Sequence, residues 1–305
     1  MNLRSRLPES FILKYYGYSM ARSAHFSVAV WVVFLTSRGI DFSQVGFLDG
    51  AFSLALIAFE VPTGYIGDRI GRRNSILVSI VVSAVASIGF AFSHSFRLFV
   101  TVYAGLAVAQ TFRSGTDTAW LYDALGERLT EEQFTHVKGQ ANALGYVMTA
   151  LAAVVGGYVG NINLAYPWIM EGVAYLIGIP LVLSFPGTDI TDDEGKPFRL
   201  FDALPAIKEQ LPKRPLRSFI LYTGVLYGVA GAINFFVQPI SVDFGFNPDM
   251  LGWLFAGFTL LSAAVSYNSG WIRSRFGVEQ WFRAAPLVLG PRFIRESNYE
   301  RLNLC

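Results

Sequence analysis

Charged residues are scarce in this chain of 305 residues. Lys, Arg, Asp and Glu together make up 15% of it, whereas soluble domains contain about 25%. Hydrophobic residues make up 53%, and the mean hydropathy is +0.42. This balance argues against a soluble domain and indicates a protein that crosses a membrane several times. The net charge of +2 is too small to support a nucleic-acid partner.

Cysteine is nearly absent, and a cleavable leader is not expected. The single cysteine, Cys305, cannot form an intramolecular disulfide. Arg4 and Arg6 precede an apolar run, as in a signal peptide. That run, however, is long, contains Arg22 and His25, and lacks a small-residue cleavage site. We interpret it as a retained first transmembrane helix.

Apolar runs long enough to cross a bilayer occur along most of the chain. A transmembrane helix needs about 20 mostly apolar residues. By that rule the expected spans are 11–36, 44–66, 74–93, 97–122, 139–160, 165–185, 216–240 and 250–272. Lys and Arg concentrate in the N-terminus and in alternate loops, so the positive-inside rule predicts a cytoplasmic N-terminus. The predicted fold is an all-α, polytopic membrane protein with about eight transmembrane helices.

The reversal between the second and third spans is the most informative stretch. Its sequence at 64–73 is GYIGDRIGRR, in which glycines permit a tight turn and arginines mark the cytoplasmic side. It resembles the loop between the second and third helices of the major facilitator superfamily, with the pattern G-x-x-x-D-R-x-G-R-R/K. The matching residues are Gly64, Asp68, Arg69, Gly71, Arg72 and Arg73. The resemblance implies a cytoplasmic gating motif in which a loop arginine, Arg72 or Arg73, meets an acid at the end of the fourth helix, here Asp123.

The resemblance also implies two six-helix bundles joined by a linker. The expected parts are a first bundle at 1–185, a cytoplasmic linker with an interfacial helix at 186–215, a partial second bundle at 216–290 and a polar tail at 291–305. A shift of about 206 positions lays span two on span eight, as parallel halves require. The second half contains helices seven, eight and a fragment of nine, which predicts a truncated or frameshifted transporter.

Ionisable residues inside the predicted spans must face protein or a water-filled cavity. Tyr18, Arg22 and His25 recur at i, i+4 and i+7, so we expect them on one face of a continuous first helix. In the family, helices one, four and seven line the central cavity. The expected substrate path is therefore Arg22, His25, Arg113, Asp117, Asn234 and Gln238. Structural pairing and ordinary interhelical hydrogen bonding are the alternatives.

Pairs of opposite charge are expected at similar depths in the bundle. Helical rise makes an Arg22–Asp117 pair and a Glu60–Arg113 pair feasible. Acids outnumber arginines within the spans of the first half, which favours a cationic substrate or a carboxylate that takes up a proton. Glu60 and Asp117 are the candidates for proton coupling.

The expected function is secondary transport of a small molecule across the cell membrane by alternating access, coupled to protons. Gly156 and Gly157 partly match a fifth-helix element of antiporters, which favours efflux. An inactive remnant is the alternative, because the eleventh helix that would meet Asp68 is missing. A membrane enzyme is not expected, since no nucleophile and base stand at a suitable spacing.

No metal or other cofactor is predicted. The linker contains a cluster of acids, but nothing in the sequence supplies a rigid oxygen cage, and charge runs are usually solvated. These acids are Asp189, Asp192, Asp193 and Glu194.

Overall fold

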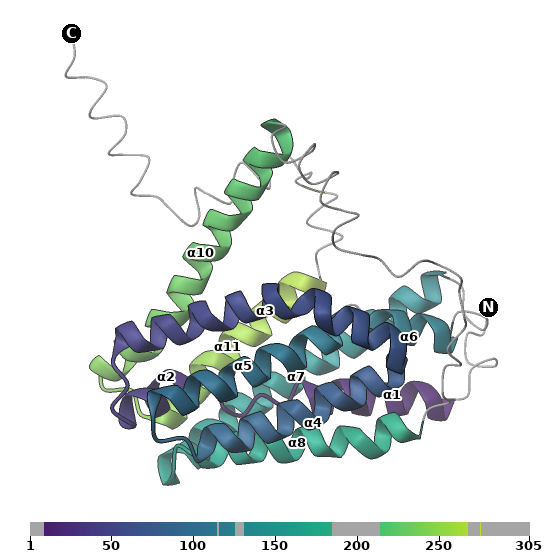
Figure 1. Cartoon of the computed structure of the whole chain (residues 1–305). Coiled ribbons are helices and arrows are strands. Elements are labelled where there is room, and N and C mark those ends of the chain that lie inside the picture. Colours follow the sequence, from purple (N-terminus) through teal and green to yellow (C-terminus); the bar gives the residue numbers. More distant parts are fainter. Residues whose placement is uncertain (1–8, 115, 126–130, 185–213, 268–274, 276–305) are drawn as a thin grey trace. The chain divides into compact units, whose positions relative to one another are not determined.

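The computed structural model describes residues 9–114, 116–125, 131–184, 214–267 and Arg275, and every regular element in these ranges is an α-helix (Figure 1). The helices are α1 (Glu9–Arg22), α2 (Trp31–Ser37), α3 (Phe42–Ile70), α4 (Arg72–Ala91), α5 (Phe96–Arg113), α6 (Thr116–Leu125), α7 (Glu131–Ile162), α8 (Tyr166–Leu183), α10 (Arg214–Asp243) and α11 (Pro248–Tyr267). The predicted all-α, polytopic fold is confirmed. Among the described helices, α3, α4, α7, α8, α10 and α11 are long and apolar enough to cross a membrane.

The chain divides into two compact units. The first takes its residues from Met1–Leu200 and Gln238–Ala263, and the second from Phe201–Val237 and Ala264–Cys305. The described part of the second unit is mainly the portion of α10 that precedes Gln238. The predicted boundaries of bundle, linker and tail stay predictions, because the acidic linker and the polar tail lie outside the described residues.

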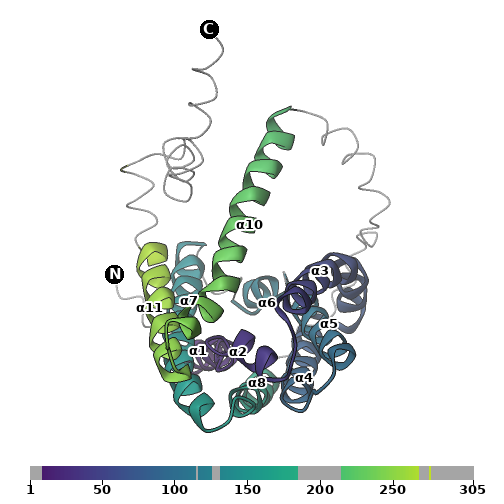
Figure 2. The ribbon, with the colours of Figure 1, turned by 90° about the vertical axis from the view of Figure 1, so that its left-hand side faces the viewer.

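The first unit is a helical bundle that buries small and aromatic side chains. α4 packs against α5 and α8, α3 packs against α5, and α1 packs against α7 and α8 (Figures 1 and 2). Buried serines recur at every fourth position of α4, where their small size lets neighbouring helices approach. These serines are Ser75, Ser79, Ser83 and Ser87. Many large apolar side chains point outward instead, as on a surface that faces lipid.

Two of the predicted spans are interrupted, contrary to expectation. Span one ends as α1 at Arg22 and resumes as α2 at Trp31, with residues 23–30 outside any helix. Span four ends as α5 at Arg113 and resumes as α6 at Thr116. The prediction that Tyr18, Arg22 and His25 share one helical face is therefore wrong, because His25 lies beyond the end of α1. Apolar runs cannot predict such breaks. The backbone groups left unpaired at a break need hydrogen-bond partners, and these come from distant helices.

The reversal between α3 and α4 is tighter than the sequence predicts. α3 continues through Gly64 and Gly67 to Ile70, and α4 begins at Arg72, so Gly71 alone separates the two helices. Gly71 has φ +83° and ψ +155°, a conformation that is essentially restricted to glycine. The antiparallel arrangement of α3 and α4 therefore rests on one glycine and not on the three that the motif suggested.

We predict that Gly71→Ala lowers the stability of the bundle and that Gly64→Ala does not. A side chain at Gly71 strains the backbone at a cost of about 1–3 kcal/mol. A Cβ at Gly64 meets nothing within 4 Å, and alanine favours the helix interior there. Thermal unfolding of the two purified variants in detergent measures the difference. Equal midpoints for both variants would contradict the one-residue turn.

Candidate functional site

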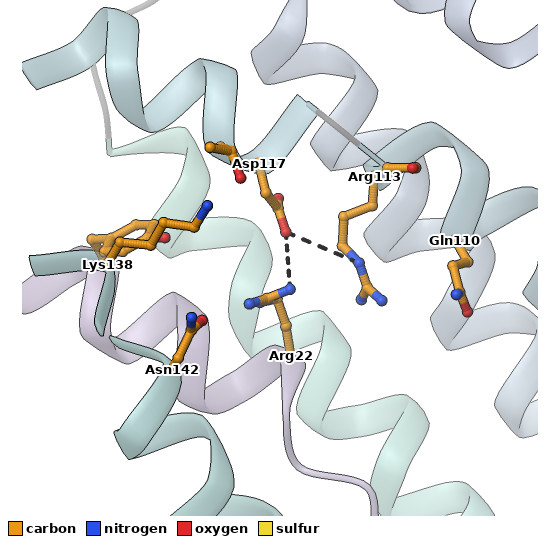
Figure 3. A pocket seen from close by; sticks show the side chains of 9 residues that line it. Arg22, Gln110, Arg113, Asp117, Lys138 and Asn142 are labelled. Carbon is orange, nitrogen blue, oxygen red and sulfur yellow. Dashed lines mark hydrogen bonds and ion pairs between the residues drawn. The ribbon is translucent and has the colours of Figure 1, made fainter. Parts of the chain in front are cut away.

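A polar cavity lies where the interrupted helices meet. It has a volume of about 300 Å³ and opens among α1, α5, α6 and α7 (Figure 3). Its lining residues are Tyr15, Arg22, Gln110, Arg113, Ser114, Asp117, Thr118, Lys138 and Asn142. All of them belong to the first unit, and three of the six predicted substrate-path residues are among them.

Three charged residues are grouped at the centre of this cavity. The Nη1 of Arg22 lies 3.0 Å from the Oδ2 of Asp117, which confirms the pair that the sequence made feasible. The Nε of Arg113 approaches the same oxygen at 4.0 Å, and dashed lines in Figure 3 join both arginines to the carboxylate. The hydroxyl of Tyr18 donates to the other oxygen of Asp117 at 2.7 Å. One carboxylate therefore holds α1, α5 and α6 together.

The helix ends explain why the charges stand in these positions. Arg22 lies in the last turn of α1, and Arg113 is the last residue of α5. Asp117 lies in the first turn of α6. Cations are favoured at helix C-termini and anions at N-termini, so each charge complements the dipole of its own helix. The breaks thus create both the space and the electrostatic conditions for this cluster.

Lys138 and Asn142 complete the lining from α7, together with Tyr15 from α1. The predicted span 139–160 begins one residue after Lys138 and so leaves this residue outside the helix. α7 instead starts at Glu131, so Lys138 lies inside the helix and faces the cavity. The first turns of α7 are polar, and hydropathy alone therefore placed the start of the helix too late.

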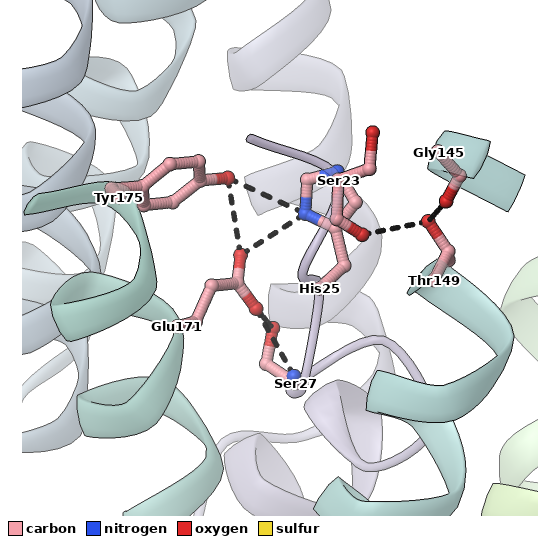
Figure 4. A network of polar contacts seen from close by, with 7 residues as sticks. All are labelled: Ser23, His25, Ser27, Gly145, Thr149, Glu171 and Tyr175. Carbon is pink, nitrogen blue, oxygen red and sulfur yellow. Dashed lines mark hydrogen bonds and ion pairs between the residues drawn. The ribbon is translucent and has the colours of Figure 1, made fainter. Parts of the chain in front are cut away.

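His25 belongs to a second network, which supports the break in span one (Figure 4). Glu171 of α8 is buried and accepts hydrogen bonds from the backbone N–H and the hydroxyl of Ser27, at 3.0 and 2.6 Å. The Nδ1 of His25 lies 3.3 Å from Glu171, and the hydroxyl of Tyr175 donates to the same carboxylate. On the other side, Thr149 donates to the carbonyl of Ser23 at 2.7 Å. His25 does not line the cavity.

Gln238 of α10 completes the support of this break. Its side chain is fully buried, its Oε1 accepts from the N–H of Val32, and its Nε2 donates to the carbonyl of Val28, both at 2.9 Å. Interhelical hydrogen bonding, the alternative weighed for Gln238, describes these contacts. Asn234, one turn earlier on α10, is exposed and belongs to the second unit. Neither residue lines the cavity.

Glu60 lies apart from the charge cluster. Its side chain is exposed on α3, and no ion pair joins it to Arg113, whose described partner is Asp117. The expected Glu60–Arg113 pair is therefore wrong.

The residues of the predicted gating motif gather around the Gly71 turn. Asp68 is exposed, and the guanidinium of Arg69 lies over the ring of Tyr65, 4.4 Å from its centroid. Arg72 donates to the carbonyl of Ala119 at 2.8 Å, and Arg73 donates to that of Leu183 at the same distance. These bonds tie the start of α4 to α6 and to the end of α8. The side chain of Asp123 lies outside the described part of the chain, so its pairing stays a prediction.

The all-α architecture and the apolar outer surface define a polytopic helical membrane protein. A family model described as Major Facilitator Superfamily matches residues 15–291. The chain belongs to the Major Facilitator Superfamily.

Individual relatives support this assignment. The MFS-type transporter YxaM of Bacillus subtilis is 26% identical over 261 residues, covering 81% of this chain and 63% of the relative. Lactose permease of Klebsiella oxytoca is 25% identical, covering 84% of this chain and 64% of the permease. This chain thus spans less than two thirds of either protein.

Solved structures show the same fold. The nucleoside transporter NupG matches with a TM-score of 0.72 at 12% identity, covering 88% of this chain and 68% of that protein. A bacterial homologue of the human lysosomal transporter Spinster matches with a TM-score of 0.65 at 15% identity, covering 88% of this chain and 62% of that homologue. The predicted family membership is confirmed.

We predict that Gln238→Leu destabilises the first unit and that Asn234→Leu does not. Leucine at 238 leaves the N–H of Val32 and the carbonyl of Val28 without their partner, and each unsatisfied group costs about 1–3 kcal/mol. Asn234 lies on the same helix and is exposed, so it provides a matched control. Thermal unfolding in detergent compares the two variants. Equal losses would show that Gln238 does not support the break.

Proposed function

We propose that this protein is a secondary transporter that moves a small molecule across the cell membrane by alternating access, and that the cavity between α1, α5, α6 and α7 is its substrate site. The observation that carries the proposal is the cluster of charged side chains around a cavity at the breaks of two helices. Charge at membrane depth is costly and is a mark of substrate and ion pathways. Discontinuous helices are a recurring way to build such sites in transporters.

Family membership supports transport in preference to catalysis. Among the relatives, the lactose permease is named for a sugar and NupG for a nucleoside, which is consistent with small-molecule transport. The cytoplasmic N-terminus that the positive-inside rule predicts belongs to the same proposal. Because the chain spans less than two thirds of YxaM and of lactose permease, its activity by itself is also part of the proposal. An inactive remnant stays the alternative.

Proton coupling is proposed at Asp117. Among the described residues that line the cavity, Asp117 is the one acid, and its carboxylate holds the ends of α1 and α5. Protonation removes its charge, weakens its attraction to both arginines and so frees these helix ends to move. Glu60, the other coupling candidate, is exposed and has no part in this cluster. Its role stays a prediction.

The glycine pair Gly156 and Gly157 gives little support to efflux. A Cβ at Gly156 would meet the carbonyl of Phe26, and a Cβ at Gly157 would lie 3.0 Å from the Cα of Gly252. Close backbone packing therefore accounts for both glycines without reference to direction. Efflux stays a prediction from the resemblance.

We predict that Asp117→Asn abolishes proton movement coupled to a transported compound and that Asp49→Asn preserves it. The purified chain is reconstituted in liposomes that contain a pH-sensitive dye, and lactose, uridine, succinate, phosphate and tetraphenylphosphonium are added in turn. Asp49 is an exposed acid on α3 away from the cavity, so it controls for the loss of one acid. Proton movement that persists in Asp117→Asn would overturn the coupling role. No movement with any of the compounds would overturn transport by this chain.

A further inference from the structure

We infer that the substrate of this cavity is a small organic or inorganic oxyanion, such as a carboxylate or a phosphate. The inference rests on the proposed function, because it names the substrate class of the same site. It reverses the expectation from the sequence, in which a surplus of acids within the spans favoured a cation.

Three of the four acids that created this surplus do not line the cavity. Asp49 and Glu60 have exposed side chains on α3. Glu171 is buried in the separate network with Ser27 and His25. Asp117 is therefore left as the acid among the described residues of the lining.

Cations outnumber this acid around the cavity. Arg22, Arg113 and Lys138 face one carboxylate, which leaves an excess of two positive charges in the described lining. Such an excess is costly inside a bilayer unless a counter-charge is present. An anionic ligand supplies that counter-charge, whereas a cationic ligand would add to the excess.

The three cationic side chains also differ in how closely each pairs with an acidic side chain. Arg22 is held closely by Asp117, at 3.0 Å, but Arg113 lies 4.0 Å from the same oxygen. Lys138 forms no ion pair with any residue that the structure describes. Arg113 and Lys138 thus approach the cavity from α5 and α7 with donors available. A guanidinium and an ammonium are the groups that bind carboxylates and phosphates in proteins.

Asp117 connects anion binding with proton binding. The charged and titratable groups near it are Tyr15, Tyr18 and Arg22 from α1, Arg113 from α5 and Lys138 from α7, while Arg72 of α4 donates to the carbonyl of Ala119. A proton on Asp117 raises the positive excess from two to three and releases Arg22 and Arg113. Proton and anion therefore strengthen each other's binding, and this reciprocity favours transport of both in the same direction.

Binding to the purified full chain in detergent tests the substrate class separately from transport. Thermal stabilisation and titration calorimetry are run with succinate, inorganic phosphate, uncharged lactose and cationic tetraphenylphosphonium. We expect stabilisation by succinate or phosphate, and weaker binding of that anion in Arg113→Gln and in Lys138→Gln. Each loss should be about tenfold or more, as for a lost charge-assisted hydrogen bond.

Two controls separate specific binding from unfolding and from general charge effects. Arg97→Gln removes an exposed arginine from the other end of α5 and should leave anion binding unchanged. Lys138→Arg keeps the positive charge and should therefore retain the anion binding that Lys138→Gln loses. The inference would be overturned if neither anion stabilised the protein, or if only the cation or lactose did. It would also be overturned if Arg97→Gln lost as much anion binding as Arg113→Gln and Lys138→Gln. Anion binding without uptake into liposomes would support the substrate class and count against transport by this chain.

Discussion

The ion pair between Arg22 and Asp117 is the interaction on which the rest of the site depends. Two charges inside a bilayer are tolerable when they neutralise each other and keep their remaining hydrogen bonds. Asp117 meets this condition with Arg22 on one oxygen and the hydroxyl of Tyr18 on the other. Arg113 approaches from a third helix. The pair therefore joins the end of α1 to the start of α6, close to the end of α5, and the cavity lies among these helix termini.

The break in span one depends on partners that are far away in the sequence. Glu171 of α8, Thr149 of α7 and Gln238 of α10 all bond to backbone groups in the interrupted stretch. In a membrane such groups have no water to bond with, so these side chains take the place of the missing helical hydrogen bonds. Polar residues on three helices thus stabilise the interruption between α1 and α2, next to the charged cavity.

The sequence predicted the fold well and the site in part. Apolar length predicted eight spans, and six of them are described helices that are long and apolar enough to cross a membrane. The Gly-Asp-Arg motif predicted the family and the reversal before Arg72. Residue types and depth also predicted the Arg22–Asp117 pair. These features are local or follow from simple helical geometry, so a single sequence contains them.

What failed depends on tertiary contacts. The breaks at 23–30 and after Arg113 are stabilised by distant side chains, which no hydropathy window detects. Lys138 was missed because the polar first turns of α7 are helical in the bundle. The count of acids that favoured a cationic substrate has the same weakness, because it ignored that Glu60 is exposed on α3 and that Glu171 is already engaged with Ser27.

A double-mutant cycle of Arg22→Gln and Asp117→Asn, followed by unfolding in detergent, tests the central claim most directly. If the two side chains neutralise each other inside the bundle, each single variant leaves the other group without its partner. The double variant is then more stable than the sum of the two losses predicts, by about 1 kcal/mol or more. Losses that add to within about 0.5 kcal/mol would show that the pair does not hold the broken helices together.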